Sequence, residues 1–179
     1  MKRSTDRILT THTGSLPRPD DLLAMLQARE QGKEKDTPAF YAQAARAVEE
    51  VVRAQVEAGI DIVNDGEQGK VAVSREALEF PEFSGNRGPI GMPFIKRPTC
   101  SGPLAWKDFA AVERDIAVLK AVAVKYPAAD FFLTAVSPGQ ASRFLGNKYY
   151  PSHEAYLRAL GALMHDEYTA IAKAGFILQ

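Results

Sequence analysis

The chain has 179 residues, of which 46% are hydrophobic and 25% charged, and its 22 basic side chains balance its 22 acidic ones. This composition excludes a disordered chain and a coiled coil, and the zero net charge gives no electrostatic basis for binding nucleic acid or a membrane surface. With no apolar signal core, no run of about 18 apolar residues and a single cysteine, Cys100, the sequence predicts one globular, cytoplasmic domain with no disulfide.

The first part of the chain changes between strand-like and helix-like hydrophobic periods. Residues 8–16 are rich in β-branched side chains and are followed by Pro17, which predicts a strand running into a loop. The acidic pair that begins at Asp20 suits the N-terminus of a following helix. Residues 40–58 carry apolar side chains at three- and four-residue steps, which predicts a long amphipathic helix ended by Gly59. A short strand over 60–67 follows and ends in acidic residues.

The second part repeats the pattern after a stretch rich in Gly and Pro. Residues 94–100 are consistent with an irregular strand, and 106–126 predict a helix. A short buried strand is predicted over 131–136. Ser152 suits the N-cap of a last long helix, and a further strand begins at Phe176.

Short apolar strands alternating with amphipathic helices predict an α/β fold with a parallel sheet covered by helices. A (β/α)8 TIM barrel has eight strands and eight helices over about 250 residues, whereas we count about four or five strands here. We therefore interpret residues 1–179 as a single partial barrel domain, the N-terminal half to two-thirds, with the remaining elements beyond Gln179. The open strand edges of such a piece would favour self-association.

The carboxyl ends of parallel strands are where functional groups gather in such folds. After the first predicted strand, Gly14 and Ser15 would leave backbone N–H groups and a hydroxyl free for a carboxylate or phosphate. An ordinary turn capped by Ser15 explains the same residues. His12 precedes them and is a candidate site residue without an assigned role.

Two further strand ends carry candidate residues. Asp65 and Glu67 could bind an ammonium group, hold a metal, or act as acid and base, or they could be solvated turn residues. The small residues of 134–139 would let a ligand approach closely, although a tight turn explains them equally well. Arg97 could meet an anionic substrate or a neighbouring acid. Cys100 and the three histidines do not have zinc-site spacing, so none of these four residues is predicted to be a zinc ligand.

Five motifs in order resemble the catalytic domain of cobalamin-independent methionine synthase and its shorter single-domain relatives. They are TTHTGSLPRP at 10–19, AGIDIVNDGEQ at 58–68, the Arg-Pro pair and SGPL within 97–104, FLTAVSP at 132–138, and AGFILQ at 174–179. Each motif alone is weak, and their order and spacing carry the resemblance.

The resemblance implies a TIM barrel that transfers the methyl group of a methyl-folate (5-methyltetrahydrofolate, as its polyglutamate) to the sulfur of homocysteine. It implies that Gly14 and Ser15 hold the α-carboxylate and that Glu67 pairs with the α-ammonium. It also implies a zinc ion whose ligands lie on later strands, outside this chain. Two alternatives stay open: a related alkyltransferase or carbon–sulfur enzyme that acts on another small thiol, and an inactive half-barrel that only binds a ligand or another chain.

Overall fold

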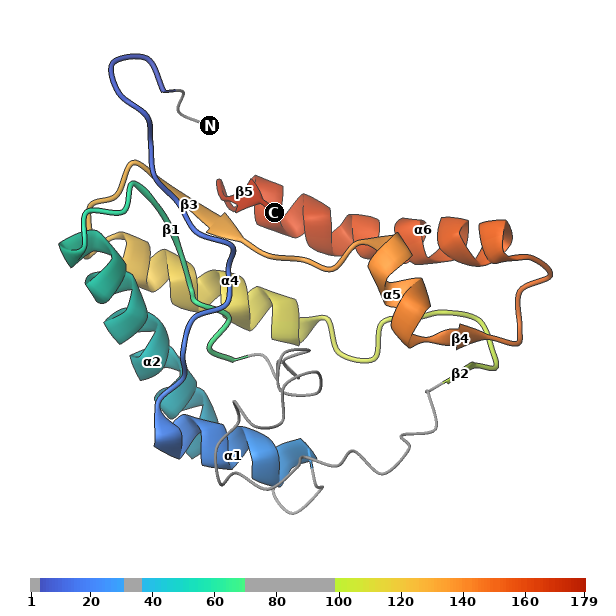
Figure 1. The fold of residues 1–179 in the computed structure, drawn as a ribbon. Helices are drawn as coiled ribbons and strands as arrows, with labels where there is room; N and C mark the ends of the chain where they lie inside the picture. Colours follow the sequence, from blue (N-terminus) through green and yellow to red (C-terminus); the bar gives the residue numbers. More distant parts are fainter. Residues whose placement is uncertain (1–3, 31–36, 70–98) are drawn as a thin grey trace, which may run out of the picture.

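The computed structural model describes residues 4–30, 37–69 and 99–179. Figure 1 shows the helices and strands in these ranges. The helices are α1 (Asp20–Glu30), α2 (Pro38–Glu57), α4 (Ala110–Ala123), α5 (Pro138–Phe144) and α6 (His153–Lys173). The strands are β1 (Ile62–Asn64), β2 (Thr99–Cys100), β3 (Asp130–Leu133), β4 (Gly146–Asn147) and β5 (Ile177–Leu178).

The main sheet has three parallel strands in the order β1-β3-β5. Val63 lies opposite Phe131, and Leu133 lies opposite Leu178. All three strands therefore end at the same edge of the sheet, which we call the carboxyl end, and begin at the opposite, amino end. This arrangement confirms the predicted α/β class with parallel strands.

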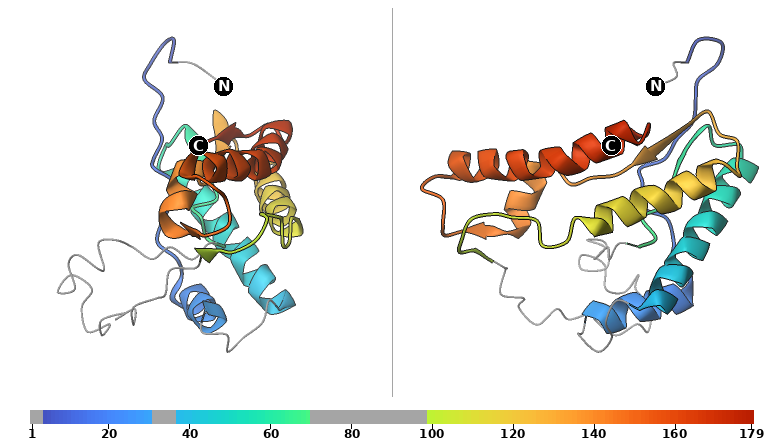
Figure 2. Two further views of the ribbon diagram at one scale, coloured as in Figure 1. Left: turned by 90° about the vertical axis from the view of Figure 1, so that its right-hand side faces the viewer. Right: turned by 180° about the vertical axis from the view of Figure 1, so that it is seen from behind.

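Helices α2, α4 and α6 cover one face of this sheet, and Figure 2 shows them from two further sides. Their apolar stripes and the sheet form the main core, as the helical periodicity predicts. The buried members of this core are Val48, Val52, Val63, Leu119, Val122, Leu133 and Ile171. Within the described residues, no helix is long and apolar enough to cross a bilayer.

The long helices follow their predicted boundaries because their capping residues are strong. Thr37 caps α2, with Pro38 at its first position, and Gly59 follows its end at φ +77°, a conformation that a residue without Cβ adopts readily. Ser152 caps α6 through its hydroxyl, which accepts from the Ala155 N–H at 3.0 Å. The helix predicted over 106–126 is shorter, since α4 begins only at Ala110.

The strand predicted over residues 8–16 is wrong. This segment runs extended beside β1, and its backbone pairs with the chain around β1 at only a few points. The Thr10 carbonyl accepts from the N–H groups of Asp61 and Ile62 at 3.2 and 3.1 Å, and the Leu16 N–H donates to the Gly66 carbonyl at 3.1 Å. The Thr10 N–H donates to the Asp61 carboxylate at 2.8 Å. A side chain therefore takes the donor that a strand would give to its neighbour's backbone.

The three strands of the main sheet lie in chain order, as neighbouring strands of a barrel do, but the strand predicted to come between β1 and β3 is not among them. β3 lies directly beside β1, and β2 pairs with β4 in a separate two-stranded parallel sheet. Of the strand predicted over 94–100, only Thr99 and Cys100 lie within the described residues. The parallel α/β class is thus shown, and the partial barrel stays a prediction.

Candidate functional site

Two segments far apart in the sequence are joined at the carboxyl end of the sheet. The side-chain amide of Asn64 donates to the Gly14 carbonyl at 3.0 Å, across 50 residues of sequence. The Leu16 N–H donates to the Gly66 carbonyl at 3.1 Å. Gln68 is fully buried, and its amide nitrogen donates back to Leu16 at 3.4 Å. The turn after the N-terminal segment is therefore fixed against the turn after β1.

Gly14, Glu67 and Thr134 meet at this junction. A Cβ atom on Gly14, whose φ is +120°, would lie 2.8 Å from Cγ2 of Thr134 and 3.3 Å from Oε1 of Glu67. The Thr134 hydroxyl donates to the same Oε1 at 2.6 Å. The other carboxylate oxygen, Oε2, has no hydrogen-bond partner among the described residues. The structure thus brings the predicted Gly14 and Glu67 together and leaves one acceptor of Glu67 available.

The backbone of Glu67 has an unusual conformation. Its φ of +55° lies in the left-handed region that few residues with a Cβ adopt. The Asp65 carboxylate accepts from the Glu67 N–H at 3.0 Å, and the Arg18 guanidinium donates to the Glu67 carbonyl at 2.6 Å. Burial lowers the pKa of Arg18, while the nearby charges of Glu67 and Asp65 raise it. The charged side chains of Arg18 and Asp65 therefore both lie close to Glu67.

The turn at Gly14 and Ser15 is only partly free to bind a ligand. The Gly14 N–H donates to Nδ1 of His12 at 3.2 Å, so the prediction that this N–H is free is wrong. Ser15 is exposed, and neither its N–H nor its hydroxyl has a partner within the part of the chain that the structure describes. The donors that the turn can offer to an anion are therefore those of Ser15.

His12 supports this turn. Because Nδ1 accepts from Gly14, the ring proton is assigned to Nε2, which donates to Oε1 of Gln55 at 2.7 Å. Gln55 is only 3% exposed and also bonds the Asn64 backbone, at 2.8 Å from its amide nitrogen and 3.1 Å to its oxygen. The His12 ring packs 5.5 Å from the ring of Phe132. Both ring nitrogens are occupied, which gives the residue a structural place beside the site.

The remaining predicted residues are distributed as follows. Asp65 is 5% exposed and belongs to the site. Arg97 lies outside the described residues. Cys100 lies in β2, where its thiol donates to the Gly102 carbonyl at 3.1 Å. In the third strand end, Ser137 caps α5 by accepting from the Gln140 N–H at 3.1 Å, so a helix begins there in place of a tight turn.

The zinc that the family resemblance implies has no fitting ligands in this site. Within the described ranges, no group of three or more His, Cys, Asp and Glu side chains could hold a metal ion. Asp65 and Glu67 are two residues apart, and each carboxylate already accepts a hydrogen bond from the protein. We assign no metal ligand to the residues described and derive no step through a metal.

Sequence reasoning missed most of the side chains that build the site. These are Arg18, Gln55, Asn64, Gln68 and Thr134. Four of them stand within the motifs already quoted, and Thr134 begins the third candidate strand end, so a polar side chain beside a strand end was the available signal. Two buried atoms here, Nε of Arg18 and Oε1 of Gln68, have no hydrogen-bond partner among the residues that the structure describes.

Comparisons with known proteins show which proteins share this fold. No family model and no curated protein matches the sequence. A protein of Listeria monocytogenes, provisionally assigned as a vitamin-B12-independent methionine synthase, matches 97% of this chain with a TM-score of 0.65 and 18% identity. A B12-independent methionine synthase of Shewanella sp. W3-18-1, solved with selenomethionine, matches 82% with a TM-score of 0.59 and 21% identity.

The chain spans about half the length of these solved structures, 52% of the first and 43% of the second. At these identities the likeness establishes a common fold. The class of protein that fold and site define is therefore a parallel α/β chain, folded like part of a methionine synthase, with a polar site at the carboxyl end of its sheet.

Proposed function

We propose that this chain binds the amino-acid end of homocysteine and forms part of an enzyme that transfers a methyl group from 5-methyltetrahydrofolate to the sulfur of homocysteine. The observation that carries the proposal is the meeting of Gly14 with Glu67, beside the donors of Ser15. An α-amino acid presents an anion and a cation two bonds apart. A site with unused donors on one turn and an unused carboxylate oxygen on the next matches that pattern.

The roles of the residues follow from their chemistry. The Ser15 N–H and hydroxyl bind the α-carboxylate, and Oε2 of Glu67 accepts a hydrogen bond from the α-ammonium. Gly14 keeps the space between Thr134 and Glu67 open, since a Cβ there would fill it. The thiol side chain of the ligand extends away from these two anchors.

The shared fold supports this proposal at the level of the ligand class. The Shewanella protein was solved with selenomethionine, an α-amino acid of the same backbone as methionine. A partial (β/α)8 barrel would also place the Gly14 and Glu67 turns at the barrel's carboxyl end, where enzymes of that fold bind their substrates.

The proposed reaction is a methyl transfer between nitrogen and sulfur. A new bond forms between the homocysteine sulfur and the methyl carbon, the bond from that carbon to the folate nitrogen breaks, and the thiol proton replaces the methyl group on nitrogen in the overall balance. A thiol with a pKa of about 8.5 is mostly protonated at neutral pH. The residues described here bind and orient the substrate, and none of them is placed to remove that proton.

The test is the substitution Glu67→Gln. NMR titration measures the affinity of the variant and of wild type for L-homocysteine and L-methionine. A charge-assisted hydrogen bond contributes about 1.5–3 kcal/mol, so we expect the dissociation constant to rise about tenfold or more. Glu57→Gln is the matched control, because Glu57 is an exposed acid at the end of α2. Equal affinities of Glu67→Gln and wild type would remove Glu67 from the ammonium role. Tighter binding of a thiol that lacks the amino-acid groups would favour the alternative alkyltransferase.

A further inference from the structure

We infer that Asp65 and Arg18 are positioning residues that hold the backbone of Glu67 in its left-handed conformation and so make the site selective for ligands with an α-ammonium group. The inference rests on the proposed function, and it assigns roles to two side chains that do not themselves contact the ligand.

The first step is the conformation of Glu67. A φ of +55° is unfavourable for a residue with a Cβ, and such a residue keeps it only where its surroundings fix it. The residue before it, Gly66, also has a positive φ, of +62°. Two successive left-handed residues turn the chain sharply after β1. Without fixed partners, Glu67 would relax to an ordinary conformation and its carboxylate would move away from Gly14.

The second step is that both peptide groups of Glu67 are held by charged side chains. Its N–H donates to Oδ1 of Asp65 at 3.0 Å, and its carbonyl accepts from Arg18 at 2.6 Å. Hydrogen bonds to charged groups are the stronger kind. Because one anchor lies on each side of the α-carbon, the two together fix both backbone torsions.

The third step concerns which atom of Glu67 the Arg18 guanidinium binds. Arg18 bonds the Glu67 carbonyl, while the carboxylate of Glu67 accepts from the neutral hydroxyl of Thr134. The carboxylate is therefore anchored without an ion pair at that oxygen, and it retains its charge and its second oxygen for a cation. An arrangement of this kind selects a ligand ammonium and disfavours a ligand that lacks it, since the second carboxylate oxygen would then stay buried beneath the ligand without a cation.

The experiment compares two ligands on variants of the full 179-residue chain. L-Methionine and 4-(methylthio)butanoate differ only in the α-ammonium group, and NMR titration gives the ratio of their affinities. We expect Asp65→Ala and Arg18→Ala to lower this ratio about tenfold, with the affinity for the butanoate unchanged. Asp65→Asn keeps an oxygen that can accept from the Glu67 N–H, and we expect it to retain the wild-type ratio within about threefold. If Asp65→Asn behaves like Asp65→Ala, the charge of Asp65 acts directly and the positioning role is wrong.

A second measurement does not depend on any ligand. Hydrogen exchange of the Glu67 amide reports its bond to Asp65. We expect exchange to accelerate about tenfold or more in Asp65→Ala and to stay slow in Asp65→Asn. The Gln140 amide, which is capped by Ser137, serves as the internal control. Equal exchange in wild type and Asp65→Ala overturns the inference. If wild type binds neither ligand, the proposed function fails and the selectivity role with it, whereas the Glu67 amide still decides whether Asp65 holds the backbone.

Discussion

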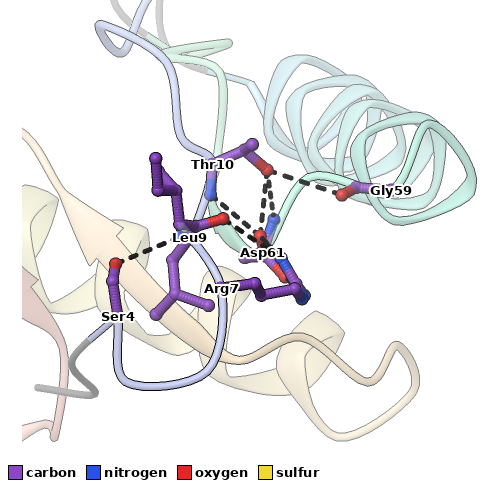
Figure 3. A network of polar contacts seen from close by, with 7 residues as sticks. Ser4, Arg7, Leu9, Thr10, Gly59 and Asp61 are labelled. Atoms are coloured by element: carbon purple, nitrogen blue, oxygen red, sulfur yellow. Dashed lines mark hydrogen bonds and ion pairs between the residues drawn. The ribbon is translucent and has the colours of Figure 1, made fainter.

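The two ends of the main sheet use carboxylates in opposite ways. At the amino end, Asp61 accepts from the Thr10 N–H at 2.8 Å, from the Thr10 hydroxyl at 3.0 Å, and from both terminal nitrogens of Arg7 (Figure 3). At the carboxyl end, within the described ranges, the Glu67 carboxylate accepts a single side-chain hydrogen bond, from Thr134. Both residues flank β1, and the difference lies in how many partners the protein itself supplies.

This difference separates a residue that stabilises the fold from one that is available to a ligand. Asp61 fixes the N-terminal segment against the start of β1, and the Arg7 guanidinium holds the pKa of its carboxyl well below the usual range. In Glu67, by contrast, two charged side chains bond the backbone, whereas the carboxylate accepts one hydrogen bond from a neutral hydroxyl. In parallel α/β folds the amino end of the sheet serves stability and the carboxyl end serves function, and each prediction below challenges that division.

The largest effect is expected from Gly14→Ala. The added methyl group would lie 2.8 Å from Thr134 and 3.3 Å from Glu67, in a backbone conformation that alanine rarely adopts. We expect loss of detectable L-methionine binding in NMR titrations, together with a loss of stability of about 1 kcal/mol or more. Gly175→Ala is the control, because its φ is also positive, at +90°, and no described residue lies within 4 Å of the new atom. The two variants should destabilise the chain, and only Gly14→Ala should abolish binding.

Asp61→Asn should show the reverse pattern. The amide keeps one acceptor oxygen but loses the charge that pairs with Arg7, so we expect the melting temperature to fall by several degrees while the affinity for L-methionine changes less than about twofold. Thermal unfolding followed by circular dichroism measures the first and NMR titration the second. Asp6→Asn removes an exposed acid from the same segment and should leave both unchanged. A large loss of affinity in Asp61→Asn would contradict the division between the two ends.

Acid should weaken the amino end in a defined pH range. Because the folded-state pKa of Asp61 lies below its unfolded value, its contribution to stability is complete above the unfolded pKa of about 4 and is lost as the pH falls through the folded value. We expect wild type to lose more stability than Asp61→Asn between about pH 5 and pH 2, as measured by urea unfolding at each pH. If the free energies of unfolding of wild type and Asp61→Asn fell equally with pH, the Asp61 carboxylate would not stabilise the folded chain.

The sequence predicted the elements that local chemistry determines. Helices α2 and α6 combine long apolar stripes with strong caps, and both lie where periodicity placed them. The strand over residues 8–16 failed because its β-branched residues satisfy the strand pattern, while Asp61 takes the N–H that pairing would use. The partner of a strand depends on distant residues, and so the place of β2 beside β4 could not be read from either segment alone.

The sequence also predicted only part of the site. Gly14 and Glu67 stand out because glycine and an acid after a strand are typical of ligand sites. The side chains that hold them, such as Arg18 and Asn64, do so through hydrogen bonds across about 50 residues of sequence. Their polar side chains beside strand ends mark them as candidates, but residue type does not reveal their partners, because the same side chains would suit a solvated turn. Only the folded geometry separates an anchored carboxylate from an exposed one.

The smallest effect is expected at Ser137, where a sequence signal for a ligand site became a helix cap. Its hydroxyl accepts from the Gln140 N–H at 3.1 Å, so Ser137→Ala should lower the free energy of unfolding by about 1 kcal/mol, as N-cap substitutions generally do. Ser152→Ala, which removes the cap of α6 far from the site, should lose a similar amount. Since Ser137 follows β3 at the carboxyl end, a loss of L-methionine affinity in Ser137→Ala alone would extend the site to the third strand. Unchanged affinity in both variants would confine it to the turns of Gly14 and Glu67 and to Thr134.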